Sequence, residues 1–452
     1  MAKQVTDMTQ GNPVSLIIKF AIPMMIGNIF QQFYNIVDSI IVGKLVGTEA
    51  LAAIGVTGSV TFLFFALCNG IGSGGGIITS QFFGSGDDRQ VKKCIANVAY
   101  IMVIFPIAVG IIAYIFSEPL LRFLDTPPEV MKDAVTYMHV MCVGLAFVSI
   151  YNYVASMLRA LGDSRTPLYF LVFSCILNTG LDFVFVYFCK WGVFGAAIAT
   201  LISQFVSGVV CLLYAFKFNS YFKLKKDDLR PNGGIIWNAV KIGVPLSLQF
   251  SLIAISCMAL QRVVNHFGPV AIAAFTATSR IEQVIHQPYQ TLGTALSTYT
   301  GQNFGAKKYE RIRLGYRKSM IMMAIFTAAM VPVMQIFGKP ITSIFVDDPA
   351  VIDMGAVALR ITSIFYVFLG VIYVVRGVLN GVGDAFFALL NGIIEVIGRL
   401  VVPIALTMVA FIGLWGIWWS VGIVWFLSGF TAWLRYVWYN KKHLTEKKVQ
   451  ID

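Results

Sequence analysis

The stretch QFFG at residues 81–84 is followed by a charged loop, and it recurs as QNFG at residues 302–305. The two copies are 221 residues apart (302 − 81 = 221), and other landmarks repeat at the same distance. They are Ala52-Ala53 with Ala273-Ala274, Ile115-Phe116 and Pro119 with Ile336-Phe337 and Pro340, Gly162-Asp163 with Gly383-Asp384, and Phe194-Gly195 with Trp415-Gly416. One offset without gaps is hard to obtain by chance, and it indicates an internal duplication.

Each copy contains six long apolar segments. They lie at about 14–42, 51–82, 91–117, 131–159, 167–189 and 192–217, and then at about 234–264, 270–301, 313–337, 350–378, 386–411 and 414–439. A helix needs about 20 apolar residues to cross a bilayer. We therefore predict twelve transmembrane helices, several of them long enough to be tilted or kinked.

The composition supports a membrane protein. Of 452 residues, 58% are hydrophobic and 12% charged, and the mean hydropathy is +0.77. Soluble domains carry roughly 25% charged residues. The net charge of +12 would suggest nucleic acid in a soluble protein. Here the basic residues lie in short loops between apolar runs, so the expected partner is the bilayer and no nucleic acid is expected.

The basic loops predict the orientation. Most of the 34 Lys and Arg residues lie in loops on one side, together with both termini. Because cytoplasmic loops are rich in Lys and Arg, both termini are predicted to be cytoplasmic, which requires an even number of spans. The first apolar stretch lacks a small-residue cleavage pattern, so no cleavable signal peptide is expected.

The duplication predicts the domain organisation. We expect an N-terminal lobe at 1–217, a cytoplasmic linker at 218–233, a C-terminal lobe at 234–440 and a cytoplasmic tail at 441–452. Six is an even number, so the copies share one orientation and are related by a pseudo-twofold axis along the membrane normal. Parallel repeats are typical of transporters, with the substrate site between the halves.

Enzymatic motifs are absent from the sequence: it has no phosphate-binding loop, no HExxH and no GxSxG. The seven cysteines show no metal-ligand spacing. The glycine run at 70–76 lies inside an apolar segment, where close helix packing or local flexibility explains it better than phosphate binding. We expect no enzyme activity and no cofactor, and we expect an ion gradient to supply the energy.

Polar side chains in the first half could bind a cation or a proton. Asp38 shares a helix face with Asn35, and Tyr34 lies one turn before it. Asn178 and Asp182 share a face of the fifth segment. Oxygen ligands suit a small hard cation, and a buried carboxylate suits a proton. The alternative is that hydrogen-bonded carboxylates here only fix helix packing.

The second half carries a different set. Glu282 and His286 lie one turn apart on the eighth segment, with Gln283 on the adjacent stripe. Glu282 could neutralise a cationic substrate or take a proton. His286 could tune the charge state of Glu282, since histidine titrates near neutral pH. The alternative is that Glu282 only forms an ion pair with a histidine or an arginine inside the helix bundle.

The eleventh segment carries charges for which a structural role is at least as plausible. Glu395 and Arg399 are spaced to pair along one helix. Arg159 and Arg376 lie near cytoplasmic helix ends, where topology or snorkelling explains them.

Taken in order and in duplicate, these motifs resemble those of the multidrug and toxic-compound extrusion (MATE) transporters over nearly the whole chain. The markers are Ile22-Pro23, Asn35-Ile36-Val37-Asp38, Gly47 to Ala53, the Gln81/Gly84 and Gln302/Gly305 loop starts, Arg159 to Asp163 and Arg376 to Asp384. The resemblance implies a V-shaped pair of six-helix bundles, alternating access, and export of organic cations in exchange for Na⁺ or H⁺.

The resemblance also implies roles for single residues. Asp38, Asn178 and Asp182 match the family's coupling residues, and Glu282 looks like an acidic residue that other bacterial members carry. Some members place cation-binding acids in the seventh and tenth helices. This chain has Ser247-Leu248-Gln249 and Phe368-Leu369-Gly370 there, without acids, so a sodium site of that kind is not expected in its second half.

We therefore predict a monomeric antiporter of the bacterial plasma membrane for cationic drugs or dyes. A lipid-linked precursor flippase of the same wider superfamily is the alternative, and the mostly acidic mid-membrane charges favour the antiporter. The predicted coupling residues are Asp38, Asn178, Asp182 and Asn35, with Na⁺ possible at the first three. The predicted substrate residues are Glu282, Gln283, His286, Tyr34, Tyr151 and Gln249.

Overall fold

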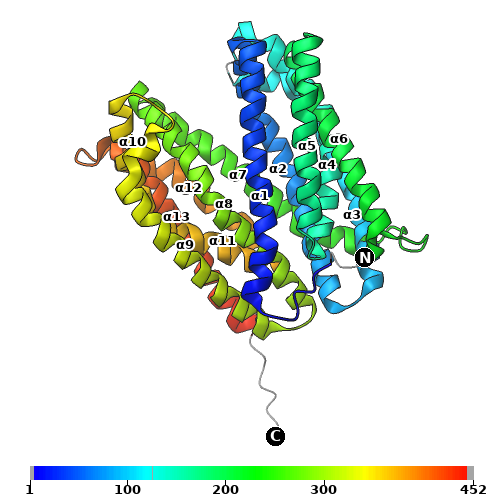
Figure 1. Cartoon of the computed structure of the whole chain (residues 1–452). Coiled ribbons are helices and arrows are strands. Elements are labelled where there is room, and N and C mark those ends of the chain that lie inside the picture. Colours follow the sequence, from blue (N-terminus) through cyan, green and yellow to red (C-terminus); the bar gives the residue numbers. More distant parts are fainter. Residues whose placement is uncertain (1–4, 125, 445–452) are drawn as a thin grey trace. The chain divides into compact units, whose positions relative to one another are not determined.

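The computed structural model describes residues 5–124 and 126–444, and this part of the chain is almost entirely helical (Figure 1). The last residues of the predicted tail, 445–452, lie outside the described residues. The first half forms α1 (Pro13–Leu45), α2 (Thr48–Ser85), α3 (Asp88–Phe123), α4 (Pro128–Ala160), α5 (Arg165–Asp182), the π-helical η1 (Phe183–Phe188), α6 (Gly192–Phe218) and the short η2 (Ser220–Phe222).

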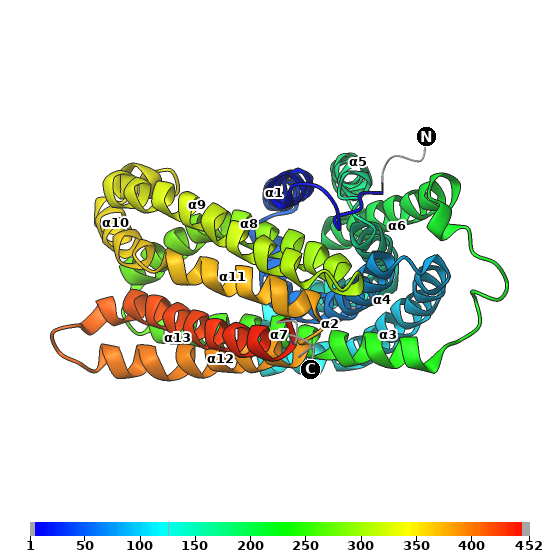
Figure 2. The same ribbon diagram turned by 90° about the horizontal axis from the view of Figure 1, so that it is seen from below.

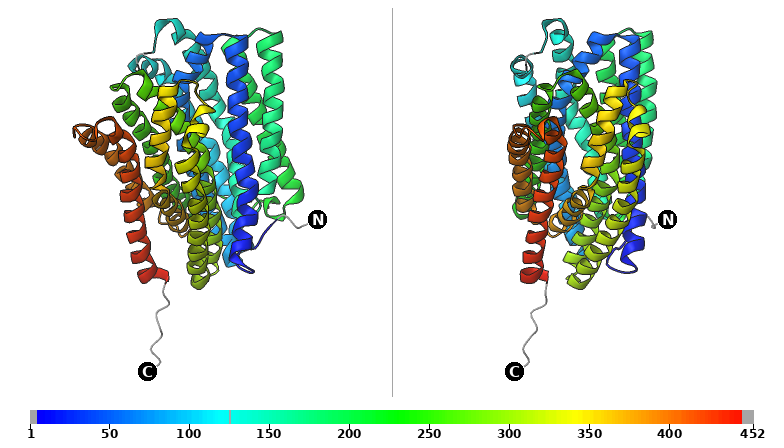
Figure 3. Two further views of the ribbon diagram at one scale, coloured as in Figure 1. Left: turned by 60° about the vertical axis from the view of Figure 1, so that its left-hand side comes forward. Right: turned by 90° about the vertical axis from the view of Figure 1, so that its left-hand side faces the viewer.

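The second half repeats the pattern of long helices. It forms α7 (Gly233–Asn265), α8 (Pro269–Gly305), α9 (Tyr309–Ser343), α10 (Pro349–Ser363), α11 (Tyr366–Gly381), α12 (Ala385–Thr407), η3 (Gly413–Trp415), α13 (Gly416–Tyr439) and η4 (Asn440–Leu444). Figures 2 and 3 show α12 (orange) and α13 (red) side by side.

The helices confirm the predicted fold class, an all-α membrane protein. Within the described residues, ten helices are long and apolar enough to cross a membrane, and α10 with α11 forms one more span bent by 52°. Helix α8, the eighth predicted segment, completes the set of twelve. It has 37 residues but is more polar than the others, because it carries Arg280, Glu282 and His286. Two predicted spans are less regular than expected. The tenth breaks between Ser363 and Tyr366, and the fifth becomes a π-helix after Asp182.

Contacts divide the chain into two compact units. Unit 1 contains the residues up to Asp7 and Lys19–Phe250, and unit 2 contains Met8–Ile18 and the chain from Ser251 onward. The division falls inside α7 and not in the 218–233 linker, because the first part of α7 packs on α2 in unit 1. There Ser247 Oγ donates a hydrogen bond of 2.6 Å to the Leu67 carbonyl oxygen. The lobe boundaries predicted from the sequence stay predictions.

The glycine run of α2 explains how α7 can approach so closely. A Cβ atom on Gly74 would lie 2.5 Å from the backbone nitrogen of Gly243, and one on Gly70 would lie 2.3 Å from that of Ser247. On another face, a Cβ on Gly75 would meet Val98 at 2.4 Å. Only glycine fits at these positions, so the prediction that the run serves close helix packing is confirmed.

The segment before α1 is held by unit 2. Met8 is fully buried, its backbone N–H donates to Gln302 Oε1 at 2.8 Å, and Asn303 Nδ2 donates to its carbonyl oxygen at 3.1 Å. Arg311 donates to the carbonyl oxygens of Met8 and Gly11 at 3.1 and 3.0 Å. The repeated QNFG stretch therefore anchors the start of the chain.

Candidate functional site

Unit 1 gathers polar side chains from α1, α5 and α6 around Thr200. Asn178 and Asp182 lie one turn apart on α5 and are buried, with 1% and 0% of their surfaces exposed. Asn178 Nδ2 donates to Thr200 Oγ1 at 3.3 Å, and the Tyr34 hydroxyl on α1 is hydrogen-bonded to the same Thr200 oxygen at 3.3 Å. Thr200 thus connects the helices that carry the predicted coupling residues.

The carboxyl groups of this cluster are short of partners. Asp38 on α1 is partly buried, and its carboxyl group lies close enough to that of Asp182 for the two to share a hydrogen bond when one of them carries a proton. Asp38 Oδ1, Asn178 Oδ1 and both carboxyl oxygens of Asp182 are buried without a hydrogen-bond partner. Buried polar atoms are nearly always satisfied in proteins. This set of oxygens is therefore suited to a proton, a small hard cation such as Na⁺, or water.

The backbone beside Asp182 is unusual. Directly after this residue the α-helix widens into the π-helical η1, which closes with Cys189 N–H donating to the Val184 carbonyl oxygen at 2.9 Å. Trp191 N–H then donates to the Phe185 carbonyl oxygen at 3.0 Å. Single π-helical turns are rare and are frequent at functional sites. No residue pattern signals this turn, since the segment reads as a plain apolar run.

Two members of the cluster were not predicted. Tyr137 on α4 is buried and lies within electrostatic range of Asp38 and Asp182, and Thr200 holds Asn178 and Tyr34. Both are hydroxyl-bearing residues inside apolar segments. That property is the only sequence signal that marks them, and many residues outside the cluster share it.

The other predicted residues of unit 1 lie in different surroundings. The Asn35 side chain is exposed, and the described hydrogen bonds include none from it. Tyr151 is buried, and its hydroxyl donates to the Pro167 carbonyl oxygen at 2.9 Å, which joins α4 to the start of α5. Gln249 is buried on α7, with 2% of its surface exposed. The structure does not bring these three side chains into hydrogen bonds with Asp38 or Asp182.

A second polar cluster occupies unit 2. Glu282 on α8 is partly buried and lies close to Thr362 on α10, Tyr366 on α11 and Arg399 on α12. Glu282 Oε1, His286 Nε2 and Arg399 Nε are buried without a hydrogen-bond partner, while the Thr362 hydroxyl lies close enough to hydrogen-bond with the Glu282 carboxylate and with Tyr366. Gln283, on the adjacent stripe of α8, is exposed. Of the predicted substrate residues, Glu282 and His286 therefore share one cluster.

Aromatic rings surround His286. Its ring centroid lies 5.4 Å from that of Trp425 on α13 and 6.4 Å from that of Tyr373 on α11, both in edge-to-face geometry. His286 also lies within electrostatic range of Arg399 and Glu395. The aromatic rings thus hold the imidazole in place by packing, and its Nε2 atom stays available for a hydrogen bond.

Two expectations about charged residues of unit 2 are wrong. Glu395 pairs with Arg376 on α11, and not with Arg399 on its own helix. Arg376 is buried, so it does not serve only as a topology signal at a helix end. Arg376 Nε also donates to Asn391 Oδ1 at 2.8 Å, and Ser428 Oγ donates to Glu395 Oε1 at 3.2 Å. Helix α11 lies against α12 here, so Arg376 on α11 pairs with the Glu395 carboxylate in place of Arg399.

Arg399 has no carboxylate partner in this arrangement. Its Nη1 atom donates to the Cys257 thiol on α7 at 2.8 Å, and its Nε atom is the buried atom without a partner noted above. Of these four charged residues, Arg376 and Glu395 form an ion pair, whereas Glu282 and Arg399 take part in none of the described ion pairs.

Comparison with known proteins places this arrangement in a family. The family model MatE matches residues 23–184 and 245–404, which cover most of the chain and fall once in each copy of the repeat. The chain belongs to the MatE family. The four coupling candidates on α1 and α5 lie in the first matched range, and Glu282, Arg376 and Arg399 lie in the second.

Individual MatE-family proteins are similar over nearly the whole chain. "Probable multidrug resistance protein YpnP" of Bacillus subtilis is 30% identical, with 98% of this chain and 99% of that protein covered. "Multidrug export protein MepA" of Staphylococcus aureus is 25% identical over 92% of this chain and 91% of that protein. A solved structure of a multidrug resistance MATE family transporter in an outward-facing conformation aligns with a TM-score of 0.88, 25% identity, and coverage of 98% and 99%.

These similarities establish the general function. The chain is a multi-pass membrane transporter of the MATE multidrug efflux family, and MATE proteins are transporters and not enzymes. The resemblance predicted from the sequence is confirmed.

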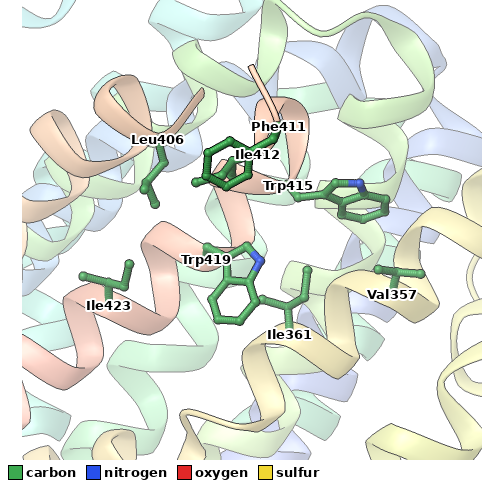
Figure 4. A pocket seen from close by; sticks show the side chains of 8 residues that line it. All are labelled: Val357, Ile361, Leu406, Phe411, Ile412, Trp415, Trp419 and Ile423. Carbon is green, nitrogen blue, oxygen red and sulfur yellow. The ribbon is translucent and has the colours of Figure 1, made fainter. Parts of the chain in front are cut away.

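This MatE-family chain also carries an apolar groove of about 540 Å³ in unit 2 (Figure 4). The groove is lined by Val357, Ile361, Leu406, Phe411, Ile412, Trp415, Trp419 and Ile423, from α10, α12, α13 and the segment between the last two. None of the charged or polar candidates lines it. We therefore assign the candidate site to the two polar clusters and not to this groove.

Proposed function

We propose that this transporter is an antiporter that exports amphipathic organic cations in exchange for Na⁺ or H⁺ by alternating access. The observation that carries the proposal is the cluster of Asp38, Asn178 and Asp182, whose buried oxygens lack partners. A charged side chain in mid-bilayer costs about 2.5–3.5 kcal/mol on insertion scales. Two neighbouring carboxyl groups are therefore best accommodated when a proton or a cation neutralises one of them.

The same cluster has the chemistry to hold either a proton or a hard cation. A pair of carboxyl groups that share a site holds one proton readily, because two adjacent negative charges repel. Carboxylate and amide oxygens are also the ligands that hard cations prefer. The donor set fits both ions, so the choice between them is left to the experiment below.

Glu282 is the proposed recognition group for the positive charge of the substrate. It carries an unpartnered carboxyl oxygen, and Tyr366 lies beside it. Trp425 and Tyr373 are close by, around His286. Aromatic faces attract organic cations, and a pocket that combines them with one acid suits cations of varied shape.

The flippase alternative is less well supported. An anionic phosphate headgroup calls for several uncompensated basic groups. In unit 2 the charge of Arg376 is neutralised by Glu395, and Arg399 lies within electrostatic range of Glu282. The acids Asp38, Asp182 and Glu282 favour a positively charged substrate instead.

The membrane potential would contribute to the driving force. Moving one elementary charge across 100 mV is worth about 2.3 kcal/mol, which corresponds to roughly fiftyfold accumulation per charge. We further propose that the protein is a monomer in the bacterial plasma membrane with both termini cytoplasmic. Reporter fusions at the two termini test the orientation, and an active reporter on the outer side would contradict it.

The test is dye efflux from proteoliposomes under an imposed Na⁺ gradient and, separately, an imposed pH gradient. We expect one of the gradients to drive export of an amphipathic cation, and Asp38→Asn to abolish the response. The matched control is Glu118→Gln, which removes an exposed acid that pairs with Arg122 outside the cluster and should leave the response unchanged. If the Asp38→Asn protein couples export to the gradient as the wild type does, Asp38 is not the coupling residue.

A further inference from the structure

The linker between α6 and α7, residues 219–232, is held in a fixed position on α3. Figure 2 shows it as the green loop at the right-hand edge of unit 1. Asn97 on α3 is fully buried. Its Nδ2 atom donates to the Arg230 carbonyl oxygen at 3.3 Å, and its Oδ1 atom accepts from the Asn232 N–H at 2.7 Å. A buried amide that satisfies two backbone groups of the linker fixes the path of the chain there.

The rest of the linker is anchored in the same way. Phe222 is fully buried in a core cluster that it shares with residues of α3. The Tyr221 hydroxyl donates to Asp88 Oδ1 at 2.8 Å, and the Tyr100 hydroxyl on α3 donates to the Leu229 carbonyl oxygen at 2.6 Å. The linker is therefore an ordered surface of unit 1, and the side chains that it displays are held in fixed places.

This surface displays lysine side chains. Lys217 at the end of α6 and Lys223, Lys225 and Lys226 in the linker are exposed. None of the four takes part in an ion pair of the described residues. Four positive charges thus lie within ten residues of chain.

The two acids of the linker are engaged by other groups. Asp228 is buried, and its Oδ2 atom accepts a hydrogen bond from the Lys225 backbone N–H at 2.9 Å. Asp227 pairs with Arg230 at 3.5 Å, with both side chains exposed. The ammonium groups of the four lysines therefore remain without a carboxylate partner within the described part of the chain.

The basic turn between α8 and α9 in unit 2 behaves differently. Lys308 Nζ donates to the Thr9 carbonyl oxygen at 3.0 Å, Arg311 donates to carbonyl oxygens of the segment before α1, and Arg313 pairs with Glu310. Both regions carry the excess of Lys and Arg that sets topology, but in unit 2 the protein itself binds several of these charges. A topology signal also needs no fixed backbone. The lysines of the linker are thus available to a partner outside the chain.

Aromatic side chains place the linker at the level of the lipid headgroups. Phe218 directly before it and Trp237 shortly after it are exposed, with 48% and 65% of their surfaces accessible. Exposed aromatic side chains at the ends of membrane spans are typical of the membrane–water interface. Lys217 Nζ lies 5.4 Å from the centroid of the Phe218 ring, so one of the four ammonium groups lies directly beside this aromatic position.

We propose that the linker is a docking surface for anionic phospholipid headgroups, which bind to Lys217, Lys223, Lys225 and Lys226. Clusters of about four to eight basic residues directly beside a membrane span attract anionic lipids. A zwitterionic headgroup gains less, because it carries a positive charge of its own. This surface is separate from both polar clusters. The proposed orientation of the chain enters only in assigning the surface to the cytoplasmic leaflet.

The test compares two phospholipids with identical acyl chains, the anionic phosphatidylglycerol and the zwitterionic phosphatidylcholine. Their binding to the purified full chain in a neutral detergent is measured by native mass spectrometry. We expect the wild type to bind phosphatidylglycerol roughly tenfold or more tightly than phosphatidylcholine, and the change of all four lysines to Gln to remove most of this preference. Added salt should weaken phosphatidylglycerol binding to the wild type far more than to this variant.

A control variant removes the same number of basic charges at the opposite ends of the helices of unit 1. It should keep the preference for phosphatidylglycerol. Because all the replaced residues are exposed in both variants, we expect both to unfold at nearly the same temperature as the wild type. The control changes are Lys44→Gln, Arg122→Gln, Lys132→Gln and Lys190→Gln.

Two results would overturn the docking surface: equal affinity of the wild type for both lipids, or an equal loss of preference in the control and in the lysine variant. Glycerol phosphate, which has the anionic group without acyl chains, should not displace phosphatidylglycerol at equal concentration. If it does, the surface binds soluble phosphates and the lipid proposal is wrong. No ion gradient or transported dye enters these measurements, so their failure leaves the antiporter proposal intact, and failure of the antiporter proposal leaves the docking surface intact.

Discussion

Arg376 on α11 and Glu395 on α12 form an ion pair in the interior of unit 2, where both side chains are almost completely buried. Asn391 and Ser428 supply hydrogen bonds to the pair. Buried pairs of this kind contribute little net stability, but the loss of one partner leaves the other charge uncompensated. The pair therefore fixes how α11 and α12 lie against each other.

Glu395→Gln and Arg376→Gln should each destabilise the protein strongly. The expected cost is about 3–5 kcal/mol, because an unpaired buried charge remains. Thermal unfolding of the purified protein in detergent measures the loss. Joint replacement of both residues by Met should cost less than the two single changes added together.

Glu118→Gln is the matched control for this prediction, since Glu118 pairs with Arg122 at the exposed end of α3. Exposed pairs contribute about 0–1 kcal/mol, so this variant should unfold almost as the wild type does. Equal effects of Glu118→Gln and Glu395→Gln would contradict the role given to the buried pair.

Thr200→Val should impair transport without unfolding the protein. The change keeps the side-chain volume but removes the oxygen to which Asn178 and Tyr34 are hydrogen-bonded. The two side chains would then no longer be held in place beside Asp38 and Asp182. We expect a reduced apparent affinity for the coupling ion in the gradient assay, whereas Thr179→Val, which removes a hydroxyl bonded only to the Cys175 carbonyl, should behave as wild type.

Gly74→Ala should disrupt the packing of α7 on α2. The added methyl group would lie 2.5 Å from the backbone nitrogen of Gly243, and backbone cannot move aside cheaply. Overpacking of this kind costs typically about 1–3 kcal/mol. Gly58→Ala on the same helix meets no atom within 4 Å, so it should be neutral or slightly stabilising in the same unfolding measurement. If Gly58→Ala destabilised the protein more than Gly74→Ala does, α2 and α7 would not approach as closely as described.

Asp163→Ala should destabilise the start of α5. The Asp163 carboxylate accepts hydrogen bonds from the backbone N–H groups of Arg165 and Thr166, both at 3.0 Å. Loss of a helix cap of this kind costs about 0.5–2 kcal/mol. Thermal unfolding compared with Asp163→Asn, which keeps a capping oxygen, measures the effect; no difference between the two variants would argue against capping.

The duplicated landmarks could be predicted because they serve the backbone. Gly162 and Gly383 have φ angles of +81° and +88°, which favour glycine, and each lies in the turn that ends a helix. The aspartates after them have diverged: Asp163 caps α5, whereas Asp384 accepts a hydrogen bond from Arg435 Nε at 2.8 Å. Sequence therefore predicted the scaffold of twelve segments well.

The partners of the charged residues could not be predicted in the same way. Periodicity shows which residues share a face of one helix, but not which neighbouring helix that face meets. Spacing along α12 therefore indicates a pair of Glu395 with Arg399, and it carries no information on the approach of Tyr137 from α4 to Asp38. The π-helical turn after Asp182 has no sequence signal, because it depends on how the chain satisfies its hydrogen bonds at the end of α5.

The anchoring of the chain start has a consequence for α1. Residues Met8–Ile18 belong to unit 2, whereas α1 from Lys19 onward, with Asp38, belongs to unit 1. Pro23 lies just beyond this boundary, and it cannot donate the helical hydrogen bond to the Lys19 carbonyl oxygen. The turn between the residues assigned to unit 2 and Asp38 therefore lacks one helical hydrogen bond, which makes it the place in α1 where a bend costs least.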